Sequence, residues 1–576
     1  MPNNAASARW PLRFAIAATA VAVVVPTQIV HWITIAHVAF AQTVAVFLWG
    51  VALATWGFAD PRSPVPWQRI APLGAALLLL MLGVAGSWIV LRTPAGPSLC
   101  ALGLLAASAL ALLSSGRLAC GPYRAAALSS VLWALAITGA WSTLVAAVQT
   151  FRPEWTGGVW FAGTGASGRV GANLHQPNHL GLLLMWSVLA CGALAAKSPK
   201  AKPLLTAIAL AAAVAIALTS SRIALLMVLI AGTWALLDRR LTPSTRRVIV
   251  MATLVTLATT VLWQWAGSAL GNAASVPQPL GRRSARMGVL HDTLVLIGQN
   301  PWFGVGWGEF NLAWTLSPFE PGGRTYFGHT HNLVLNLLVE LGIPLGGTIV
   351  ALLGWTVVRL WQRSRPASTG NNDGLIASAM VSLALLHCMV EFPLWFAYFL
   401  LPAIWLCGPA LQAPSATPYR EELQSTPPRQ RPWLLYGAAT AFAAFIAWID
   451  FVRVMPAALP ATDPTPVAQR IAAASSSRLF RHQADYQLVL NDPAASADLY
   501  KSARHVVIDA ALLQAWSASL ERAGRLEEAR YVSRRLLTFT QPALVGWRDL
   551  CNRADPIDPI APCVPRSPDI DWRSFR

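Results

Sequence analysis

The stretch HLGLLLMWSVLACGALAA, residues 179–196, decides the fold class. It has no charged side chain over eighteen positions, which is about the length and the composition of a helix that crosses a bilayer. Similar apolar runs recur along most of the first 450 residues, and the chain is 55% hydrophobic and only 12% charged. We therefore predict an all-α polytopic membrane protein rather than a soluble one. The 26 tryptophans agree with this class, since indole rings favour the membrane interface.

Apolar runs of roughly 16 to 26 residues predict about thirteen transmembrane helices. The predicted ranges are 14–30, 37–57, 71–91, 98–115, 125–150, 179–196, 203–219, 222–237, 248–266, 343–361, 374–390, 393–410 and 433–453. The apolar segment after Arg13 continues into a second span without a small-residue cleavage site, so we expect the first helix to be retained.

Short basic loops predict the orientation. Residues 1–453 carry 28 Lys and Arg against 12 Asp and Glu, whereas residues 454–576 carry 15 against 13. The excess behind the net charge of +18 therefore lies among the spans, where loops rich in Lys and Arg mark the cytoplasmic side. Placing the N-terminus in the cytoplasm puts most of these residues inside. This distribution argues against nucleic acid as a partner.

Four regions follow from this topology. They are 1–204, the N-terminal helices with outer loop 151–178; 205–410, further helices with outer loop 267–342; 411–453, a cytoplasmic loop and the last span; and 454–576, an outer tail. The tail has helical spacing of apolar residues and resembles a tetratricopeptide-like unit, so we expect a small docking or packing domain. Cys551 and Cys563 lie in it, and their oxidation to a disulfide stays open.

Arg222 begins a span on the predicted outer side, after Thr219, Ser220 and Ser221. A cation at that depth is costly unless it faces a partner or an aqueous cavity, so Arg222 is a functional candidate. The alternative is that its side chain extends to lipid headgroups.

A second set of cations lies in the outer loop, at Arg282, Arg283 and Arg286. They begin a predicted amphipathic helix that ends near Gln299, followed by Pro301 and a glycine-rich turn. Guanidinium groups bind phosphate through paired hydrogen bonds, which suggests an anionic, phosphate-bearing substrate. A solvated basic face is the alternative for Arg282 and Arg283. Arg286 shares a helix face with Leu290 and is expected to point toward the protein.

The stretch FGHTHNLVLNLLVELGIPLGG, residues 327–347, places His331 and Asn332 where an interfacial helix is predicted to start. A neutral imidazole there can accept or shuttle a proton near pH 7. His329 and His331 could instead bind a metal, but no carboxylate or third histidine completes a site. Glu340 is expected to end the helix with Gly342 and to orient the loop.

Uncharged hydrogen-bonding groups gather where the first outer loop returns to the membrane. They are Asn173, His175, Gln176, Asn178 and His179, a composition suited to sugar hydroxyls. Capping of the following helix by Asn178 explains part of the set without a ligand.

These motifs together resemble a bacterial superfamily of O-antigen ligases, O-antigen polymerases and O-linked oligosaccharyltransferases. The motifs are SSR at 220–222, R…NPWFGVGWGEF at 286–310 and HN…LVELG at 331–342, within roughly residues 205–400. NLHQPNHLG at 173–181, EFPLWFAYFLLP at 391–402 and the helical tail resemble the protein O-oligosaccharyltransferase branch, which glycosylates Ser or Thr of exported proteins such as pilins.

The resemblance implies a bacterial inner-membrane enzyme that takes a glycan from undecaprenyl diphosphate at the periplasmic face. His331 corresponds to the essential histidine, and Arg222 and Arg286 to the arginines that hold the diphosphate. Gln176 and Tyr398 correspond to polar positions of the oligosaccharyltransferase branch.

Two positions depart from the family pattern. Leu290 stands where an aromatic residue commonly follows the loop arginine, and Phe396 stands where a tyrosine is common.

The predicted set of substrate-binding residues is completed by Asn173, Asn178, His179, Arg283, Asn332 and Glu340.

The expected reaction is an inverting transfer in which the acceptor hydroxyl attacks the anomeric carbon. Because arginines supply the countercharge on the leaving diphosphate, no metal and no cofactor is expected. Whether His331 acts as a base or as an electrostatic group stays open. Two alternatives also stay open: transfer to lipid A core or to growing O-antigen with the same donor, and transport of a lipid or polysaccharide. The sequence leaves the glycan, the acceptor site and the oligomeric state undetermined.

Overall fold

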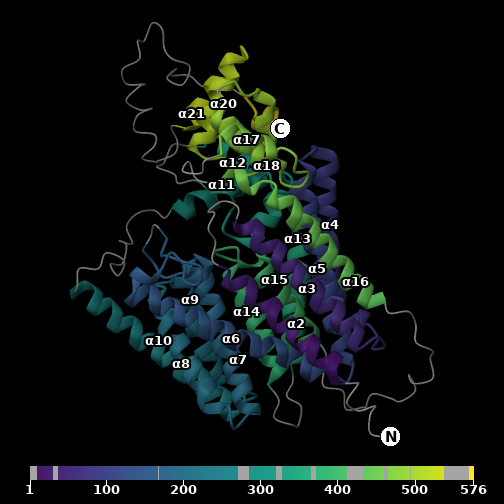
Figure 1. The fold of residues 1–576 in the computed structure, drawn as a ribbon, viewed down its shortest axis with the longest axis vertical. Coiled ribbons are helices and arrows are strands. Elements are labelled where there is room, and N and C mark those ends of the chain that lie inside the picture. Colours follow the sequence, from purple (N-terminus) through teal and green to yellow (C-terminus); the bar gives the residue numbers. More distant parts are fainter. Residues whose placement is uncertain are drawn as a thin grey trace. The chain divides into compact units, whose positions relative to one another are not determined.

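The computed structural model describes residues 9–29, 37–165, 168–269, 285–319, 327–364, 372–411, 432–458, 465–492, 494–536 and 570–576. Within these ranges every regular element is helical, with twenty α-helices and several short 3-10 turns (Figure 1). The predicted all-α class is confirmed.

Nine of the described helices are long and apolar enough to cross a membrane. They are α2 (Arg9–Gln28), α3 (His37–Ala59), α4 (Trp67–Leu91), α5 (Ala95–Cys120), α6 (Arg124–Phe151), α7 (Pro177–Lys197), α10 (Pro243–Ala269), α13 (Leu333–Arg363) and α16 (Pro432–Val452). Shorter apolar helices are α8 (Lys202–Leu218), α9 (Arg222–Leu237), α14 (Asp373–His387) and α15 (Ala397–Leu411). Each of the thirteen predicted ranges overlaps one of these helices. The chain is therefore a multi-pass membrane protein.

Contacts between Cα atoms divide the chain into two compact units, and the first comprises Met1–Leu77, Leu104–Gln278 and Leu352–Ile446. Within it, α7 packs against α6, α8 and α10 (Figure 1) and is buried along almost its whole length. Glycines allow close approach at the crossings: a Cβ on Gly181 would lie 2.4 Å from the Cβ of Ala224, and one on Gly139 would lie 2.0 Å from the Ser187 hydroxyl. Small residues at such crossings are typical of membrane helix packing.

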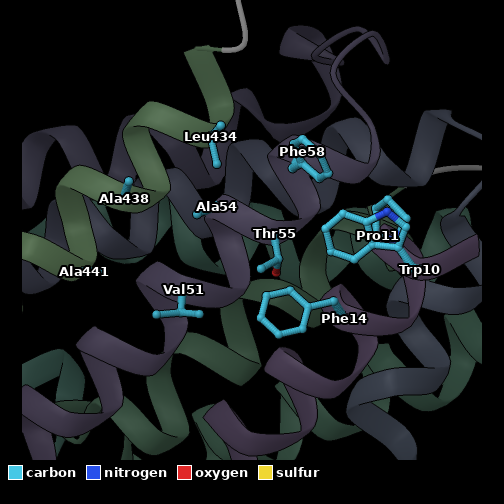
Figure 2. A pocket seen from close by; sticks show the side chains of 10 residues that line it. All are labelled: Trp10, Pro11, Phe14, Val51, Ala54, Thr55, Phe58, Leu434, Ala438 and Ala441. Atoms are coloured by element: carbon cyan, nitrogen blue, oxygen red, sulfur yellow. The ribbon is translucent and has the colours of Figure 1, made fainter. Parts of the chain in front are cut away.

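An apolar cavity of about 440 Å³ lies between α2, α3 and α16 of this unit (Figure 2). Its lining residues are Trp10, Pro11, Phe14, Val51, Ala54, Thr55, Phe58, Leu434, Ala438 and Ala441. None of these side chains titrates near neutral pH, so the cavity offers apolar surface without a group for acid–base chemistry.

The second unit comprises Leu78–Gly103, Pro279–Ala351 and Ala447–Arg576. Its helices outside the spans are α11 (Ala285–Gln299), α12 (Phe310–Leu316), α17 (Val467–Ala474), α18 (Arg481–Asn491), α19 (Tyr500–Ala503), α20 (Ala510–Arg522) and α21 (Leu526–Leu536), with a 3-10 turn at Trp572–Phe575. In the tail, α20 and α21 pack on each other across a turn where Gly524 has a φ of +73°. The predicted helical pair is confirmed, and Cys551 and Cys563 lie outside the described residues.

One hydrophobic core joins the tail to the loop helices α11 and α12. The tail also bonds to the loop backbone: the Tyr531 hydroxyl donates to the carbonyl oxygen of Leu316, and Arg535 Nε donates to that of Thr315 at 3.0 Å. The tail therefore packs directly on the outer loop that carries several of the candidate residues.

Candidate active site

The N-terminus of α7 carries the Gln176 motif. Asn178 was expected to cap this helix, and this prediction is wrong: α7 begins at Pro177, and Gln176 is its N-cap, with the Gln176 side-chain oxygen accepting from the Asn178 backbone N–H at 2.6 Å. Proline is favoured at the first helical position because the N–H that it lacks would have no partner there. The Asn178 side chain therefore makes its contacts with other helices.

A polar chain links three helix ends of the first unit. Asn178 Nδ2 donates to Glu391 Oε1 at 3.2 Å, and Asn178 Oδ1 accepts from the Ser221 hydroxyl at 2.7 Å. Ser221 also caps α9, because its Oγ accepts from the Ala224 N–H at 3.3 Å. Glu391 is only 8% exposed. The chain joins the N-termini of α7 and α9 to the turn between α14 and α15.

Arg222 is the first residue of α9 and is exposed. It follows Ser220, whose φ of +50° lies in the left-handed region. The N-terminus of a helix carries a partial positive charge, so α9 does not stabilise the guanidinium of Arg222 at that position. Both the helix end and the guanidinium favour an anion, which agrees with the predicted diphosphate contact.

Asn173 is buried in the loop that precedes α7. Its Oδ1 accepts from the Ala162 N–H at 3.0 Å, and its Nδ2 donates to the carbonyl oxygens of Gln28 at 3.1 Å and Trp160 at 3.0 Å. Gln149 holds the same loop, donating to the Ala162 carbonyl oxygen at 2.8 Å. The Asn173 amide is thus engaged in holding the loop in place.

His179 and Tyr398 lie in an aromatic part of the first unit. His179 is 3% exposed, with its ring centre 4.8 Å from that of Phe396 and 5.6 Å from that of Phe399. Tyr398 is 6% exposed, and its ring centre lies 5.2 Å from that of Phe396. Phe396, where the family commonly has tyrosine, therefore provides an apolar ring between these two candidates.

His331 belongs to the second unit and occupies the turn before α13, with a φ of +53°. Residues other than glycine rarely adopt a positive φ. His331 Nδ1 lies 3.2 Å from the carbonyl oxygen of His329. Because a carbonyl oxygen only accepts, Nδ1 carries the proton in this hydrogen bond, and Nε2 carries the lone pair of the neutral ring. The geometry thus assigns the basic nitrogen.

Short-range hydrogen bonds hold the turn around His331. Asn332 caps α13, with its Oδ1 accepting from the Leu335 N–H at 3.0 Å. The Thr330 hydroxyl donates to the Asn332 carbonyl oxygen at 2.8 Å, and the Thr330 N–H donates to Asn336 Oδ1 at 3.3 Å. Among the described residues, no group of three His, Cys, Asp or Glu side chains gathers as metal ligands.

The glycine-rich loop binds the kink of α13. The backbone leaves helical geometry at Gly342, with φ 80° and ψ 167°, which confirms that the first half of this helix ends there. Three backbone hydrogen bonds join the loop to the kink: Val305 N–H to Val339 O (2.7 Å), Gly306 N–H to Glu340 O (2.9 Å) and Ile343 N–H to Pro301 O (2.7 Å). Positive φ values at Gly304, Gly306 and Gly308 allow this path.

Glu340 lies at the centre of this contact and is 6% exposed. Its backbone carbonyl oxygen accepts from the Gly306 N–H at 2.9 Å, and its side chain lies near the backbone of Gly308 and Phe310 and near the Asn336 side chain. Glu340 therefore connects the glycine-rich loop to the helix that follows His331.

Helix α11 begins at Ala285 and ends at Gln299, in agreement with the predicted helix. Arg286 belongs to its first turn. Arg282, Arg283 and the side chain of Arg286 lie outside the part of the chain that the structure describes.

Glu391 was missed as a candidate, although a local signal was present. It is the only Asp, Glu, Lys or Arg between positions 374 and 411, and an ionisable residue within a membrane segment is a functional candidate by default.

Residues 207–350 match the O-antigen ligase family, and this range contains Arg222, Arg286 and His331. This part of the chain is therefore similar to that ligase family. Residues 375–541 match a second family, the C-terminal region of virulence factor membrane-bound polymerases.

Two curated relatives come from Acinetobacter baylyi. A general O-oligosaccharyltransferase is 36% identical over 142 residues, which are 24% of this chain and 24% of the relative. A ComP-specific O-oligosaccharyltransferase is 27% identical over 252 residues, 42% of this chain and 44% of the relative. The matches span about a quarter of the first relative and under half of the second.

Proposed function

We propose that this protein, whose residues 207–350 match the ligase family, is a glycosyltransferase that moves a glycan en bloc from undecaprenyl diphosphate to Ser or Thr hydroxyls of exported proteins. The acceptor oxygen forms a bond to the anomeric carbon, with inversion, and the bond from that carbon to the diphosphate breaks. The hydroxyl proton passes to a base, and undecaprenyl diphosphate leaves. The reaction takes place at the periplasmic face of the bacterial inner membrane, with the N-terminus in the cytoplasm and the tail in the periplasm.

The ligase-family match carries this proposal, because one matched range holds the histidine and both arginines that the motifs single out. The acceptor class rests on the relatives, since both are named O-oligosaccharyltransferases.

In the proposed reaction, Arg222 and Arg286 bind the diphosphate. Negative charge grows on this group as the glycosidic bond to it breaks, so cations placed there stabilise the transition state more than the ground state. The position of Arg222 at the N-terminus of α9 supports this role, because the backbone N–H groups of that helix end also favour an anion. Arg283 is proposed to contact the same headgroup.

His331 is proposed to accept the proton of the acceptor hydroxyl through Nε2. The hydrogen bond between Nδ1 and the His329 carbonyl oxygen supports this role because it fixes the tautomer with a basic Nε2. The resulting imidazolium would then stabilise the departing diphosphate.

The other candidates divide by their contacts. Gln176 and Asn178 lie at the N-terminus of α7 and are proposed to face the glycan. Glu340 and Asn332 are proposed as positioning residues, because the glycine-rich loop bonds to α13 at Glu340 and the Asn332 side chain caps α13 beside His331.

The test is coexpression of the full chain with a lipid-linked donor glycan and a pilin, followed by the intact mass of the pilin. We expect a mass increase of one whole glycan with the native chain and none with His331→Ala or Arg222→Ala. Arg247 is a matched control, because it is also exposed near the start of an apolar helix but on the predicted cytoplasmic side. Arg247→Ala should retain transfer. Loss of transfer in both Arg247→Ala and Arg222→Ala would contradict the assigned site.

A second candidate keeps the donor and changes the acceptor to lipid A core or growing O-antigen. The match of residues 375–541 to membrane-bound polymerases favours it. Unmodified pilin beside glycosylated lipid A or lengthened O-antigen would select this candidate. Translocation of lipid-linked glycan that persists with His331→Ala, without transfer to any acceptor, would instead indicate a transporter.

A further inference from the structure

A buried ion pair joins the tail to the glycine-rich loop within the second unit. Arg504 Nη1 lies 2.9 Å from Glu309 Oε2, and the two side chains are 5% and 1% exposed. Arg504 follows α19 in the tail, whereas Glu309 precedes α12 in the loop. The pair therefore connects two segments 195 residues apart.

Arg504 is the cation that balances this buried carboxylate. His505 Nε2 lies 3.7 Å from Glu309 Oε1, but burial, and then the nearby Arg504, keep the pKa of His505 well below its ordinary value. The imidazole is thus neutral at pH 7. Removing Arg504 would leave the buried Glu309 without its hydrogen-bonded countercharge, with only the more distant Arg576 acting on it. Loss of that partner is strongly destabilising and favours movement of the segment toward water.

The segment that would move holds the histidine turn. The Glu309 N–H donates to the carbonyl oxygen of Gly306 at 3.1 Å, and the Gly306 N–H donates to that of Glu340 at 2.9 Å. Glu340 lies about one helical turn after Asn336 in α13. Asn336 in turn accepts from the Thr330 N–H, and Thr330 precedes His331. A series of hydrogen bonds, joined through one turn of α13, therefore runs from the tail to the turn that carries His331.

We infer that Arg504 and Glu309 are positioning residues for the glycosyl transfer, so that the tail fixes the loop that orients His331. This inference rests on the proposed function for the reaction concerned. Neither residue is assigned a contact with the substrate. The tail is accordingly a part of the catalytic machinery, in addition to any role in docking an acceptor.

The test compares variants of the full chain in lipid nanodiscs. Arg504→Ala removes the countercharge, and Arg504→Lys keeps a cation without the planar fork of hydrogen-bond donors. Arg530→Ala is the matched control, because Arg530 forms an exposed pair with Glu527 in the same tail, at 2.8 Å. Glu309→Gln combined with Arg504→Met removes both charges together.

The first readout is hydrogen–deuterium exchange in peptides covering 301–310 and 333–341, which does not depend on any activity. We expect Arg504→Ala to speed exchange at the Val305 and Gly306 amides, and Arg530→Ala to leave it unchanged. The second readout is transfer from undecaprenyl diphosphate-linked glycan to a pilin. Misplacing a catalytic group by about 1 Å can lower the rate about 100-fold. We therefore expect Arg504→Ala to lower kcat by roughly 10- to 100-fold and to change the KM for the donor by no more than about twofold. Arg504→Lys should recover part of the rate.

Unchanged exchange in both peptides with Arg504→Ala would overturn the inference, as would a loss confined to KM. If Arg504→Ala does not fold, the variant with both Glu309→Gln and Arg504→Met provides the test, because it leaves no buried charge and should fold. Exchange rates and a kcat equal to those of the native chain in this variant would show that the pair does not position the loop. If the native chain transfers glycan to no acceptor while the exchange results hold, the proposed function fails and the coupling of the tail to the loop stands.

Discussion

Replacing Gly342 by alanine tests how the loop and α13 are joined. Its φ of 80° and ψ of 167° fall in a region that is essentially restricted to glycine, where another residue costs about 1–3 kcal/mol. A Cβ at this position would also lie 2.3 Å from the carbonyl oxygen of Trp302 and 2.8 Å from the backbone nitrogen of Phe303. The loop must therefore shift away from the kink.

The magnitude follows from the bonds that this shift would break. Three backbone hydrogen bonds hold the loop on the kink, and each contributes roughly 0.5–1.5 kcal/mol. Adding the conformational strain gives a loss of roughly 2.5–7.5 kcal/mol in the stability of the loop contact. Because the same loop bonds to the backbone of Glu340, which is proposed to position His331, Gly342→Ala should also lower glycosyl transfer.

Two other glycines of the second unit separate the causes. Gly308 has a φ of +75° but no heavy atom within 4 Å of an added Cβ, so Gly308→Ala should cost only the backbone strain, roughly 1–2 kcal/mol. Gly347 is helical, and the nearest atom to its added Cβ is a Leu338 methyl carbon at 4.0 Å. Gly347→Ala should be neutral or stabilising by roughly 0.5–1 kcal/mol.

The assay is unfolding of the purified chain in detergent, together with hydrogen exchange of residues 301–306 and initial rates of transfer. The expected order of stability is Gly347→Ala, then Gly308→Ala, then Gly342→Ala. A Gly342→Ala protein with the unfolding midpoint and the loop protection of Gly347→Ala would refute this account of the kink.

Three further predictions concern charge and hydrogen bonding. Glu391→Gln keeps an oxygen acceptor for Asn178 and should retain most transfer. Glu391→Ala leaves the Asn178 amide N–H unpaired, which costs about 1–3 kcal/mol, and should lower the initial rate of transfer. Equal loss of rate in both variants would show that the negative charge itself is required. Transfer should persist in EDTA because arginines supply the countercharge, and a loss reversed by Mg²⁺ would contradict the proposed roles of Arg222 and Arg286. Burial lowers the pKa of His482 from 6.5 to about 4. Between these values the unfolded chain binds a proton at His482 that the folded chain does not. The stability that comes from burying the neutral imidazole is therefore complete above pH 6.5 and is lost as the pH falls toward 4. Thermal unfolding of the full chain at pH 7.5 and 5 should show the loss, with a smaller pH dependence in His482→Gln.

The membrane helices were predictable because length and apolar composition are local properties. Residues 179–196 illustrate both the success and its limit. The helix was located correctly as α7, but a segment that is apolar on every side gives no periodic signal of what surrounds it. The structure surrounds α7 with α6, α8 and α10, and this burial depends on contacts with glycines and alanines of distant helices.

The site was predictable only where its geometry is local. The cap of α7 was placed two residues too late, although Pro177 was a usable signal, since proline favours the first helical position. The partner of the Asn178 side chain could not be found in the same way, because Glu391 lies 213 residues away along the chain. No spacing rule in the sequence connects these two residues.

The same distinction separates the residues proposed for chemistry from those that hold them. His331 and Arg222 belong to short motifs, since their position at the start of a helix is set by neighbouring residues. Arg504 belongs to no motif and resembles the other arginines of a helical tail in sequence, yet its burial against Glu309 places it in the hydrogen-bonded series that ends beside His331. A substitution at Arg504 should therefore lower kcat as a substitution near His331 does, while a substitution at the partly exposed Arg530 should not. This difference follows from burial rather than from position in the sequence.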